Sequence, residues 1–167
     1  VSRAQQQENR RQRPKAPPAG FAKIHVDAGV LRDRGGAAAA ICRDSNGHYL
    51  GSSTLVIEGV VDPAALEAIA CREGIALAQD LNVQDFVIAC DSKQVVSDIM
   101  NGSRGRFGSE INIKLAQLHC NLIFESRAAN YEAHALAKFS RRLQQGRHVW
   151  FDQPHDQNCI PLSVEFE

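Results

Sequence analysis

The segment Phe86–Cys90 constrains the fold of this chain more than any other. It reads FVIAC, a run of apolar residues, and such a run is typical of a β-strand that is buried on both faces. Asp91 and Ser92 follow at once and predict the start of a helix. The chain is therefore expected to form an α/β fold. Asp91 would stand at the carboxyl end of a central strand, the edge where open α/β sheets bind ligands.

The segments around this strand predict an antiparallel start followed by alternating helices and strands. Further strands are expected over 21–27, 37–43, 49–58 and 121–125, and the sequence DSNG at 44–47 predicts a turn. Helices are expected over 62–81, 91–100, 109–119 and 130–145, the first of them opened by Asp62 and Pro63, and a loop over 102–108. This order predicts a mixed sheet with helices packed on its faces.

The two ends of the chain differ from this body. Residues 1–20 are polar and basic and then proline-rich, which predicts a flexible leader. Residues 1–15 hold five Lys or Arg against one Glu, a net charge of +4, so the rest of this neutral chain carries −4. A basic leader suggests an acidic partner such as nucleic acid, although a solvated disordered leader has the same composition. The folded domain is expected over 21–146, with an extended tail over 147–167.

The cysteines and the hydropathy of the chain indicate the cellular compartment in which it is expected. The five cysteines are widely spaced, form no Cys-x-x-Cys pair and mostly lie within apolar runs, so we expect buried free thiols in a reducing, intracellular compartment, nuclear or cytoplasmic. No apolar run reaches the roughly 18 residues of a membrane span, and no signal-peptide pattern opens the chain. We expect no membrane partner, and a monomer or a part of a larger polypeptide. A metal site at His148, His155 and Cys159 is conceivable, but their spacing matches no common zinc pattern.

Three carboxylates are poorly explained by structural roles. Asp27 ends a strand, Glu67 lies on a small apolar helix face, and Asp91 follows the buried strand. Each has an ordinary interpretation: a turn residue, a boundary residue that pairs with an arginine, and a helix N-cap, which Ser92 can also supply. Together, however, they can converge at one sheet edge, where their mutual repulsion favours cations. Oxygen ligands select Mg²⁺ or Mn²⁺, and two such ions are the apparatus of in-line phosphodiester cleavage.

Five short motifs follow one another along the chain. They read KIHVDA at 23–28, GG at 35–36 with RDSNG at 43–47, LEAIACREG at 66–74, CDS at 90–92 and ANYEAHALAK at 129–138. In this order they resemble the ribonuclease H type 1 family, and more narrowly the ribonuclease H-like domains of plant retroelement-derived proteins, over about residues 18–145. The resemblance implies a ribonuclease H-like five-stranded mixed sheet of order 3-2-1-4-5 flanked by helices. It also implies divalent-metal-dependent hydrolysis of the RNA strand of RNA–DNA hybrids.

The same resemblance assigns roles to individual residues. Asp27 would bridge two metal ions, while Glu67 and Asp91 would complete their coordination. Glu67 would also lie near the 2′-hydroxyl that marks RNA. The positions where the family contacts its hybrid substrate are Ser92, Lys93 and Asn130.

The fourth acidic position of the family is altered in this chain. The usual pattern is Ala-Asp-x-Leu-Ala-Lys, but residues 133–138 read AHALAK. His134 therefore takes the place of the carboxylate, as a fourth catalytic and metal-binding position just over one turn after a helix N-cap at Asn130. A neutral imidazole favours Mn²⁺ over Mg²⁺ and can orient or deprotonate a water.

Three functions are open at this point. The first is a hybrid nuclease that His134 weakens, and the second is a catalytically weak or inactive nucleic-acid-binding domain of the same fold. The third is a retroelement remnant or protein-interaction module, in which His134 is an ordinary helix residue. No basic helix-loop insertion of the kind that some family members use to grip the duplex is found in the sequence.

Overall fold

The computed structural model describes residues 11–101, 105–118 and 120–167, which form one mixed sheet covered by helices. The strands are β1 Ala22–Leu31, β2 Gly35–Arg43, β3 Tyr49–Glu58, β4 Phe86–Cys90, β5 Asn121–Phe124 and β6 Gly146–Phe151. They lie in the order β5-β4-β1-β2-β3-β6. β1, β2 and β3 are antiparallel neighbours, and β4 and β5 continue the sheet in parallel with β1. The first five strands thus confirm the order and the ribonuclease H-like architecture expected from the sequence.

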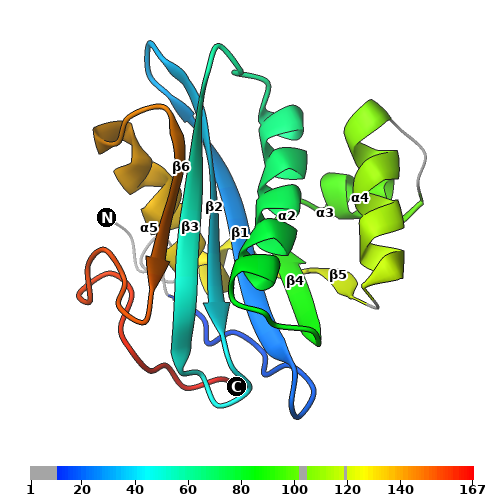
Figure 1. Ribbon diagram of the computed structural model, residues 1–167, viewed down its shortest axis with the longest axis vertical. Coiled ribbons are helices and arrows are strands. Elements are labelled where there is room, and N and C mark those ends of the chain that lie inside the picture. The colour runs from blue at the N-terminus through cyan, green and yellow to red at the C-terminus, as the bar shows by residue number, and fades with distance from the viewer. Residues whose placement is uncertain (1–10, 102–104, 119) are drawn as a thin grey trace, which may run out of the picture.

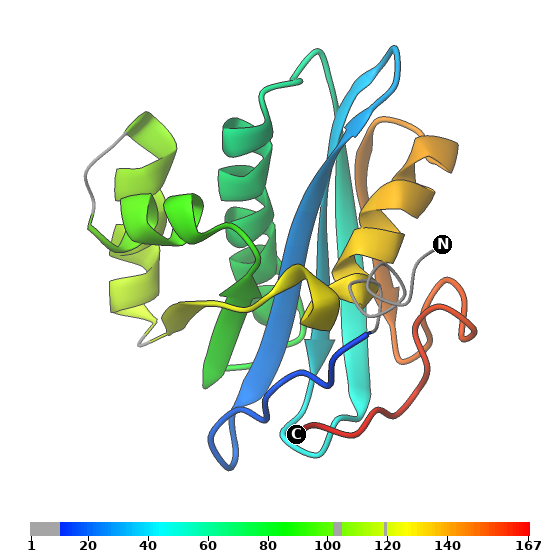
Figure 2. The ribbon, with the colours of Figure 1, turned by 180° about the vertical axis from the view of Figure 1, so that it is seen from behind.

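Helices cover both faces of the sheet (Figure 1). The elements are α2 Pro63–Asp80, α3 Lys93–Met100, α4 Gly105–Gln117 and α5 Tyr131–Phe139, with short 3-10 turns η1 Arg127–Ala129 and η2 Ser140–Arg142 around α5. α2 lies on one face with α3 and α4 beyond it, and α5 lies on the other face (Figure 2). The larger core fills the α2 side, and a second one under α5 joins Ala39 and Ile41 to Ala133 and Leu136.

Helix α2 packs unusually close to the sheet, which positions its acidic residue. Asp62, where the sequence predicts that the helix opens, caps its start by accepting a hydrogen bond from the Ala65 backbone N–H at 3.0 Å. A Cβ added to Gly36 would lie 2.4 Å from Leu66, and one added to Gly74 would lie 2.9 Å from Val26. A side chain at either position would have to displace the side chain that faces it. The first turns of α2 are therefore fixed beside the carboxyl ends of β1 and β4.

Lys23 and His25 interrupt the apolar alternation of β1, yet both are buried. Both contact Glu125, with His25 Nε2 at 2.6 Å from its Oε1, while the Lys23 ammonium also donates to the Lys15 carbonyl. Burial alone would raise the pKa of Glu125, but the hydrogen bonds from His25 and Lys23 outweigh it and hold the pKa below its usual value. The cluster ties β1 to the end of β5.

The tail predicted over 147–167 overlaps a sixth strand that the sequence did not reveal. β6 pairs antiparallel with β3 and forms one edge of the sheet. Arg147 on this strand makes ion pairs with Glu73 and Asp80 of α2, the first at 2.6 Å. The sequence GRHVWF mixes polar and aromatic residues without a clear alternation, so the strand is defined by these long-range contacts.

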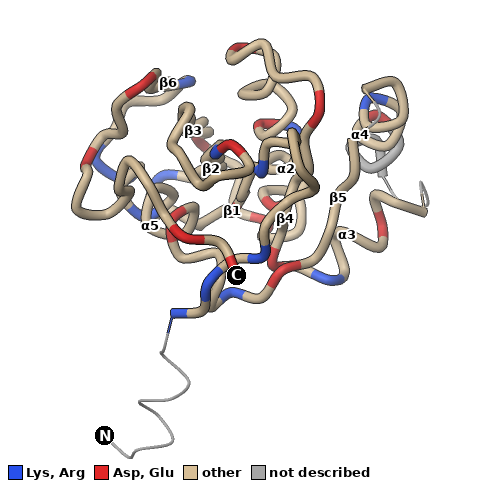
Figure 3. The backbone as a smooth tube through the Cα atoms, turned by 90° about the horizontal axis from the view of Figure 1, so that it is seen from below, with Lys and Arg blue, Asp and Glu red and all other residues tan. Residues whose placement is uncertain are grey.

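The described part of the leader lies against the end of the tail, as seen from below in Figure 3. The Glu167 backbone N–H donates to the Pro14 carbonyl at 2.8 Å, and the Gln12 N–H donates to the Ala128 carbonyl at 3.0 Å. Residues 1–10 of the predicted flexible leader lie outside the described residues. The segment from residue 11 has no regular secondary structure but is hydrogen-bonded to the domain.

Two helix predictions differ from the structure at their ends. α4 begins at Gly105, inside the predicted loop, and α5 ends at Phe139 before the turn η2 rather than near residue 145. Helix ends depend on local caps that residue periodicity locates only approximately. All five cysteines are free; Cys159 is exposed and the other four are buried, which confirms the expectation of buried thiols. Among the described helices, none has the length and hydropathy needed to cross a bilayer.

Candidate active site

Four side chains converge beside the carboxyl end of β4, next to the middle of β1. The sequence predicts that the first strand ends at Asp27, but β1 continues to Leu31 because its second half pairs with β2. Asp27 lies within β1, Glu67 in the first turns of α2, Asp91 directly after β4 and His134 in α5. The strand register explains part of this meeting, since Val26 of β1 pairs with Cys90 of β4 and so places the next residues of both strands side by side. The structure thus brings together all four residues that the sequence predicts as metal and catalytic positions.

The contacts within this group join it into one cluster. His134 Nδ1 lies 3.0 Å from Asp27 Oδ2, and the Asp27 side chain is almost fully buried. Ligand atoms of Glu67, Cys90 and Asp91 all lie within 4.8 Å of one another. A carboxylate at Asp27 would accept this hydrogen bond, and His134 would then donate it from Nδ1. The His134 ring is half exposed, and its Nε2 atom remains for a water or a substrate.

The electrostatics of the cluster favour a positive ligand. Burial, together with the charges of Asp27, Cys90 and Asp91 and a hydrogen bond to Asp27, raises the pKa of Glu67 to about 10. Burial and the Asp27 charge also raise the pKa of Asp91, against the opposing effect of Arg127. Protonation of carboxyls at neutral pH is the usual response of an acidic cluster that lacks a neutralising cation.

The donor set fits hard divalent cations. Three carboxyl groups supply oxygen ligands, which Mg²⁺ and Mn²⁺ prefer, and one imidazole supplies a nitrogen that Mn²⁺ accepts more readily. The Cys90 thiol contacts Glu67 at 3.8 Å and is a soft donor that these ions do not favour. Asp27, Glu67, Asp91 and His134 are therefore the residues that can hold such ions.

Arg127 and Cys90 belong to the site although the sequence did not identify them. Arg127 of η1 lies 3.6 Å from Asp91 and its side chain is largely exposed. Nothing in the sequence links these two residues, which lie far apart in the chain. Cys90 could have been found, since it immediately precedes Asp91, but its apolar surroundings indicated a core residue.

The predicted substrate-binding positions have different surroundings. The Ser92 hydroxyl accepts from the Val95 N–H and caps α3, and Lys93 is exposed above the Phe124 ring. Asn130 is 1% exposed and its amide donates to the Val26 carbonyl at 2.8 Å. It occupies the N-cap position of α5 without the predicted side-chain cap bond. Its contact instead braces α5 against β1 beside Asp27.

The conceivable tail site does not form among the described residues. His155 packs between the rings of Phe139 and Trp150, and His148 contacts the Gln144 carbonyl. The exposed Cys159 contacts Asp156. Of the residues described, only the group of Glu67, Cys90 and Asp91 brings three potential ligands within metal-binding distance.

The raised pKa of Glu67 predicts how pH affects the metal-free protein. An unfolded glutamate titrates at about pH 4.3, whereas Glu67 titrates at about 10 in the fold, so the folded state binds an extra proton between these values. We expect the free energy of unfolding in EDTA to fall as the pH rises from about 5 to about 9. Glu67→Gln should flatten this dependence and the exposed control Glu110→Gln should not. Urea titrations at several pH values measure it, and equal slopes for all three proteins would contradict it.

Residues 25–140 match a family model described as reverse transcriptase-like. The chain is also similar to RNase H1 from the halophilic archaeon Halobacterium salinarum, at 18% identity over 71% of this chain and 96% of that one, with a TM-score of 0.60. The N-terminal RNase H domain of a Mycobacterium tuberculosis protein gives 20% identity, 74% and 95% coverage and a TM-score of 0.62. No curated protein sequence matches the chain.

A third similar structure contains a nucleic acid. It is an RNase H1 isolated from compost by a metagenomic approach, in complex with an RNA/DNA hybrid. The identity is 17%, over 71% of this chain and 94% of that chain, and the TM-score is 0.59. These likenesses show that the chain has the ribonuclease H fold.

Proposed function

Since the chain belongs to the reverse transcriptase-like family, we propose that it is a divalent-metal-dependent nuclease that hydrolyses the RNA strand of RNA–DNA hybrids. The observation that carries this proposal is the convergence of Asp27, Glu67 and Asp91 from three separate elements at one sheet edge. A purely structural role does not explain why one buried and two partly buried carboxyl groups should face one another. The similarity to a hybrid-bound RNase H1 supports the choice of substrate.

In the proposed reaction, the chain supplies ligands for metal ions and an imidazole that accepts a proton. Asp27, Glu67 and Asp91 would hold two Mg²⁺ or Mn²⁺ ions. Such ions lower the pKa of a bound water and neutralise charge on the phosphate under attack. His134, with Nδ1–H donated to Asp27, presents Nε2 to orient the attacking water or to accept its proton. Glu67 would also lie near the 2′-hydroxyl that distinguishes RNA from DNA.

A cleavage assay tests the proposal directly. The purified chain is incubated with an RNA–DNA hybrid labelled on the RNA strand, in Mg²⁺, in Mn²⁺ and in EDTA. We expect the RNA strand to be cut in the presence of metal and to stay intact in EDTA. RNA duplex, DNA duplex and single-stranded RNA serve as comparison substrates. Failure to cut the hybrid under either metal would refute the nuclease proposal.

His134 sets the expected metal preference. A neutral imidazole is a weaker ligand for Mg²⁺ than for Mn²⁺, so we expect faster cleavage in Mn²⁺. His134→Asp should restore an oxygen ligand and raise the Mg²⁺-supported kcat by roughly tenfold, a change of about 1.4 kcal/mol in activation free energy. The measurement is the ratio of kcat in the two metals for both proteins, with His134→Ala as a control for loss of the ring. An unchanged ratio would show that His134 has no special role.

A second candidate is a domain that binds hybrids without cutting them. Two contacts favour it: His134 occupies an oxygen of Asp27, and Arg127 partly neutralises Asp91. Both reduce the negative charge available to cations. Hybrid binding that is unaffected by EDTA, combined with no cleavage in either metal, would support this candidate over the nuclease.

A further inference from the structure

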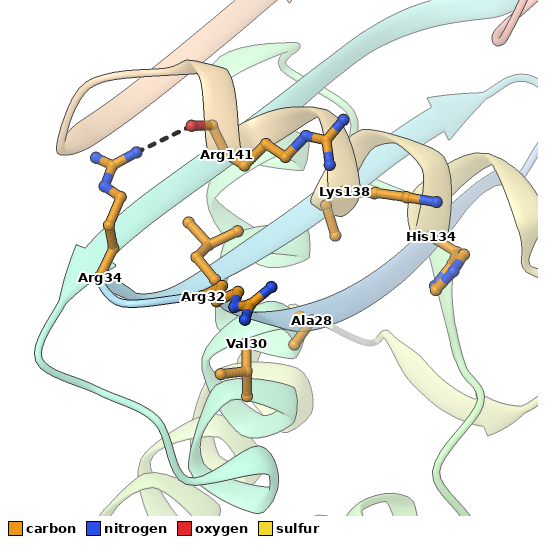
Figure 4. Close-up of a pocket in the computed structure, with 10 residues that line it drawn as sticks. Ala28, Val30, Arg32, Arg34, His134, Lys138 and Arg141 are labelled. Atoms are coloured by element: carbon orange, nitrogen blue, oxygen red, sulfur yellow. Dashed lines mark hydrogen bonds between the residues drawn. The ribbon is translucent and has the colours of Figure 1, made fainter.

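A pocket of about 540 Å³ opens directly beside the acidic site. One wall is the end of β1 with the following turn, and the other is the exposed side of α5 with η2 (Figure 4). Four cationic side chains line it, namely Arg32, Arg34, Lys138 and Arg141. None of the described residues that line the pocket carries a carboxylate. A pocket lined by cationic side chains therefore adjoins a cluster of carboxyl groups.

The walls of the pocket are held by Arg34. Its guanidinium donates to the carbonyls of Arg141 and Leu143, at 3.2 and 2.8 Å, and lies 3.7 Å from Glu58. These contacts fasten the turn after β1 to η2, as the dashed line in Figure 4 shows for Arg141. Because these contacts occupy the Arg34 guanidinium, Arg34 shapes the pocket more than it offers positive charge to a ligand.

The other cations of the pocket remain available to a ligand. Within the described part of the chain, the side chains of Arg32, Lys138 and Arg141 have no hydrogen-bond or ion-pair partner, and all three are exposed. The floor between them is small and apolar: a Cβ added to Gly29 would lie 3.9 Å from Ala137. Small floor residues leave room for a group that the three cations can surround.

The pocket and the acidic site share one residue. His134 lines the pocket and also contacts Asp27. Lys138 and Arg141 follow it at spacings of four and three residues, which places them along the same side of α5 and its continuation η2. A ligand that lies in the pocket would thus extend toward the carboxylates past His134.

We propose that this pocket binds backbone phosphates of the strand whose bond is cut, next to the phosphate at the carboxylates. This inference rests on the proposed function, because it assumes that a nucleic-acid strand reaches the acidic site. A strand at the acidic site places one phosphate beside the carboxylates, where only metal cations can neutralise the phosphate charge. Its neighbouring phosphates then meet Arg32, Lys138 and Arg141, whose charges match them without a metal. The exposed Val30 at the mouth of the pocket offers an apolar surface to a sugar.

Binding measurements in an inactive background test the pocket. Hybrid affinity is measured by fluorescence anisotropy in Mg²⁺ at a series of salt concentrations, with all proteins carrying Asp27→Asn so that no cleavage occurs. We expect the added triple change Arg32→Gln, Lys138→Gln, Arg141→Gln to weaken binding by about 10- to 100-fold at low salt. It should also reduce the slope of log affinity against log salt by about 2 to 3, since each lost phosphate contact removes about 0.9.

A matched pair of single variants separates the pocket from general surface charge. Lys138→Gln and Lys114→Gln each remove one lysine from a helix, but Lys114 lies on α4, away from the pocket, and pairs with Glu110. We expect Lys138→Gln alone to reduce the slope by about 0.9. If both single variants and the triple variant bind like the background, the pocket proposal is overturned while the proposed function stands. If the protein that carries Asp27→Asn alone does not bind hybrid, that result contradicts the proposed function and not the pocket proposal.

Position along the strand gives a second readout. Hybrids are prepared with a single neutral methylphosphonate at each phosphate of the RNA strand in turn. The background protein should lose affinity at one or two positions beside the cut, and the triple variant should be insensitive at those positions. Inorganic phosphate is added as a competitor in parallel. Displacement of hybrid by millimolar phosphate, without any position effect, would show an anion site unrelated to the strand and overturn the proposal.

Discussion

Asp27→Asn is expected to remove hybrid cleavage, with kcat lowered by about 10³-fold, or about 4 kcal/mol of activation free energy. Asp27 is central in the cluster: it contacts His134 and raises the pKa of both Glu67 and Asp91. The amide that replaces it has the same size but no negative charge to hold a cation. Its oxygen can still accept a hydrogen bond from His134, so the fold should be retained.

The control for this result is Asp98→Asn. Asp98 lies on α3, where it accepts a hydrogen bond from Gln94, and it takes no part in the acidic cluster. We expect its kcat to equal that of the unchanged protein. Circular dichroism and urea unfolding establish that both variants are folded. Retention of full activity by Asp27→Asn would exclude the proposed role of the cluster.

The largest expected effect on stability comes from Arg43, a buried residue near the end of β2. Its side chain makes two hydrogen bonds to Glu132 of α5, at 2.6 and 3.0 Å, and donates to the carbonyls of Gly47 and Pro161. Arg43→Met would leave the Glu132 carboxylate buried without its partner. We expect the free energy of unfolding, measured in urea, to fall by about 3–5 kcal/mol.

Two further variants test whether the lost ion pair causes this change. Arg43→Met combined with Glu132→Leu replaces both charges with apolar groups, so most of the loss should be recovered. Lys114→Met, which breaks the exposed pair with Glu110, should change stability by less than about 0.5 kcal/mol. If the double variant were as unstable as Arg43→Met, the loss would instead come from the contacts of Arg43 with Gly47 and Pro161.

Features that depend on neighbouring residues were predictable from the sequence. The buried strand Phe86–Cys90, the Asp62 cap of α2 and the turn at 44–47 each have a local physical cause, and the structure contains all three. The convergence of Asp27, Glu67 and Asp91 was also predictable. It follows from a carboxylate on one strand, a second just after the adjacent parallel strand and a third near the start of the helix between them, although Asp27 proves to lie within β1 and not at its end.

Features that depend on distant partners were not predictable. Glu125 accepts from Lys23 across 102 positions of sequence, and Arg127 reaches Asp91 through the turn η1. The sequence predicts that the Asn130 side chain caps a helix, but its amide donates a hydrogen bond to the Val26 carbonyl of β1 instead. β6 likewise exists because β3 offers it an open edge. In each case the deciding contact is made only after the sheet has formed.

The distribution of the cysteines makes the protein suitable for single-site chemical labelling. Cys42, Cys71, Cys90 and Cys120 are buried, whereas Cys159 is exposed. A maleimide dye or spin label should therefore attach to the folded chain at one position without any cysteine being replaced. Desolvation, together with the charge of Asp156 and the hydrogen bond to it, raises the pKa of the Cys159 thiol, so mildly alkaline buffer would speed the reaction. Such a label would leave the residues of the acidic cluster unaltered.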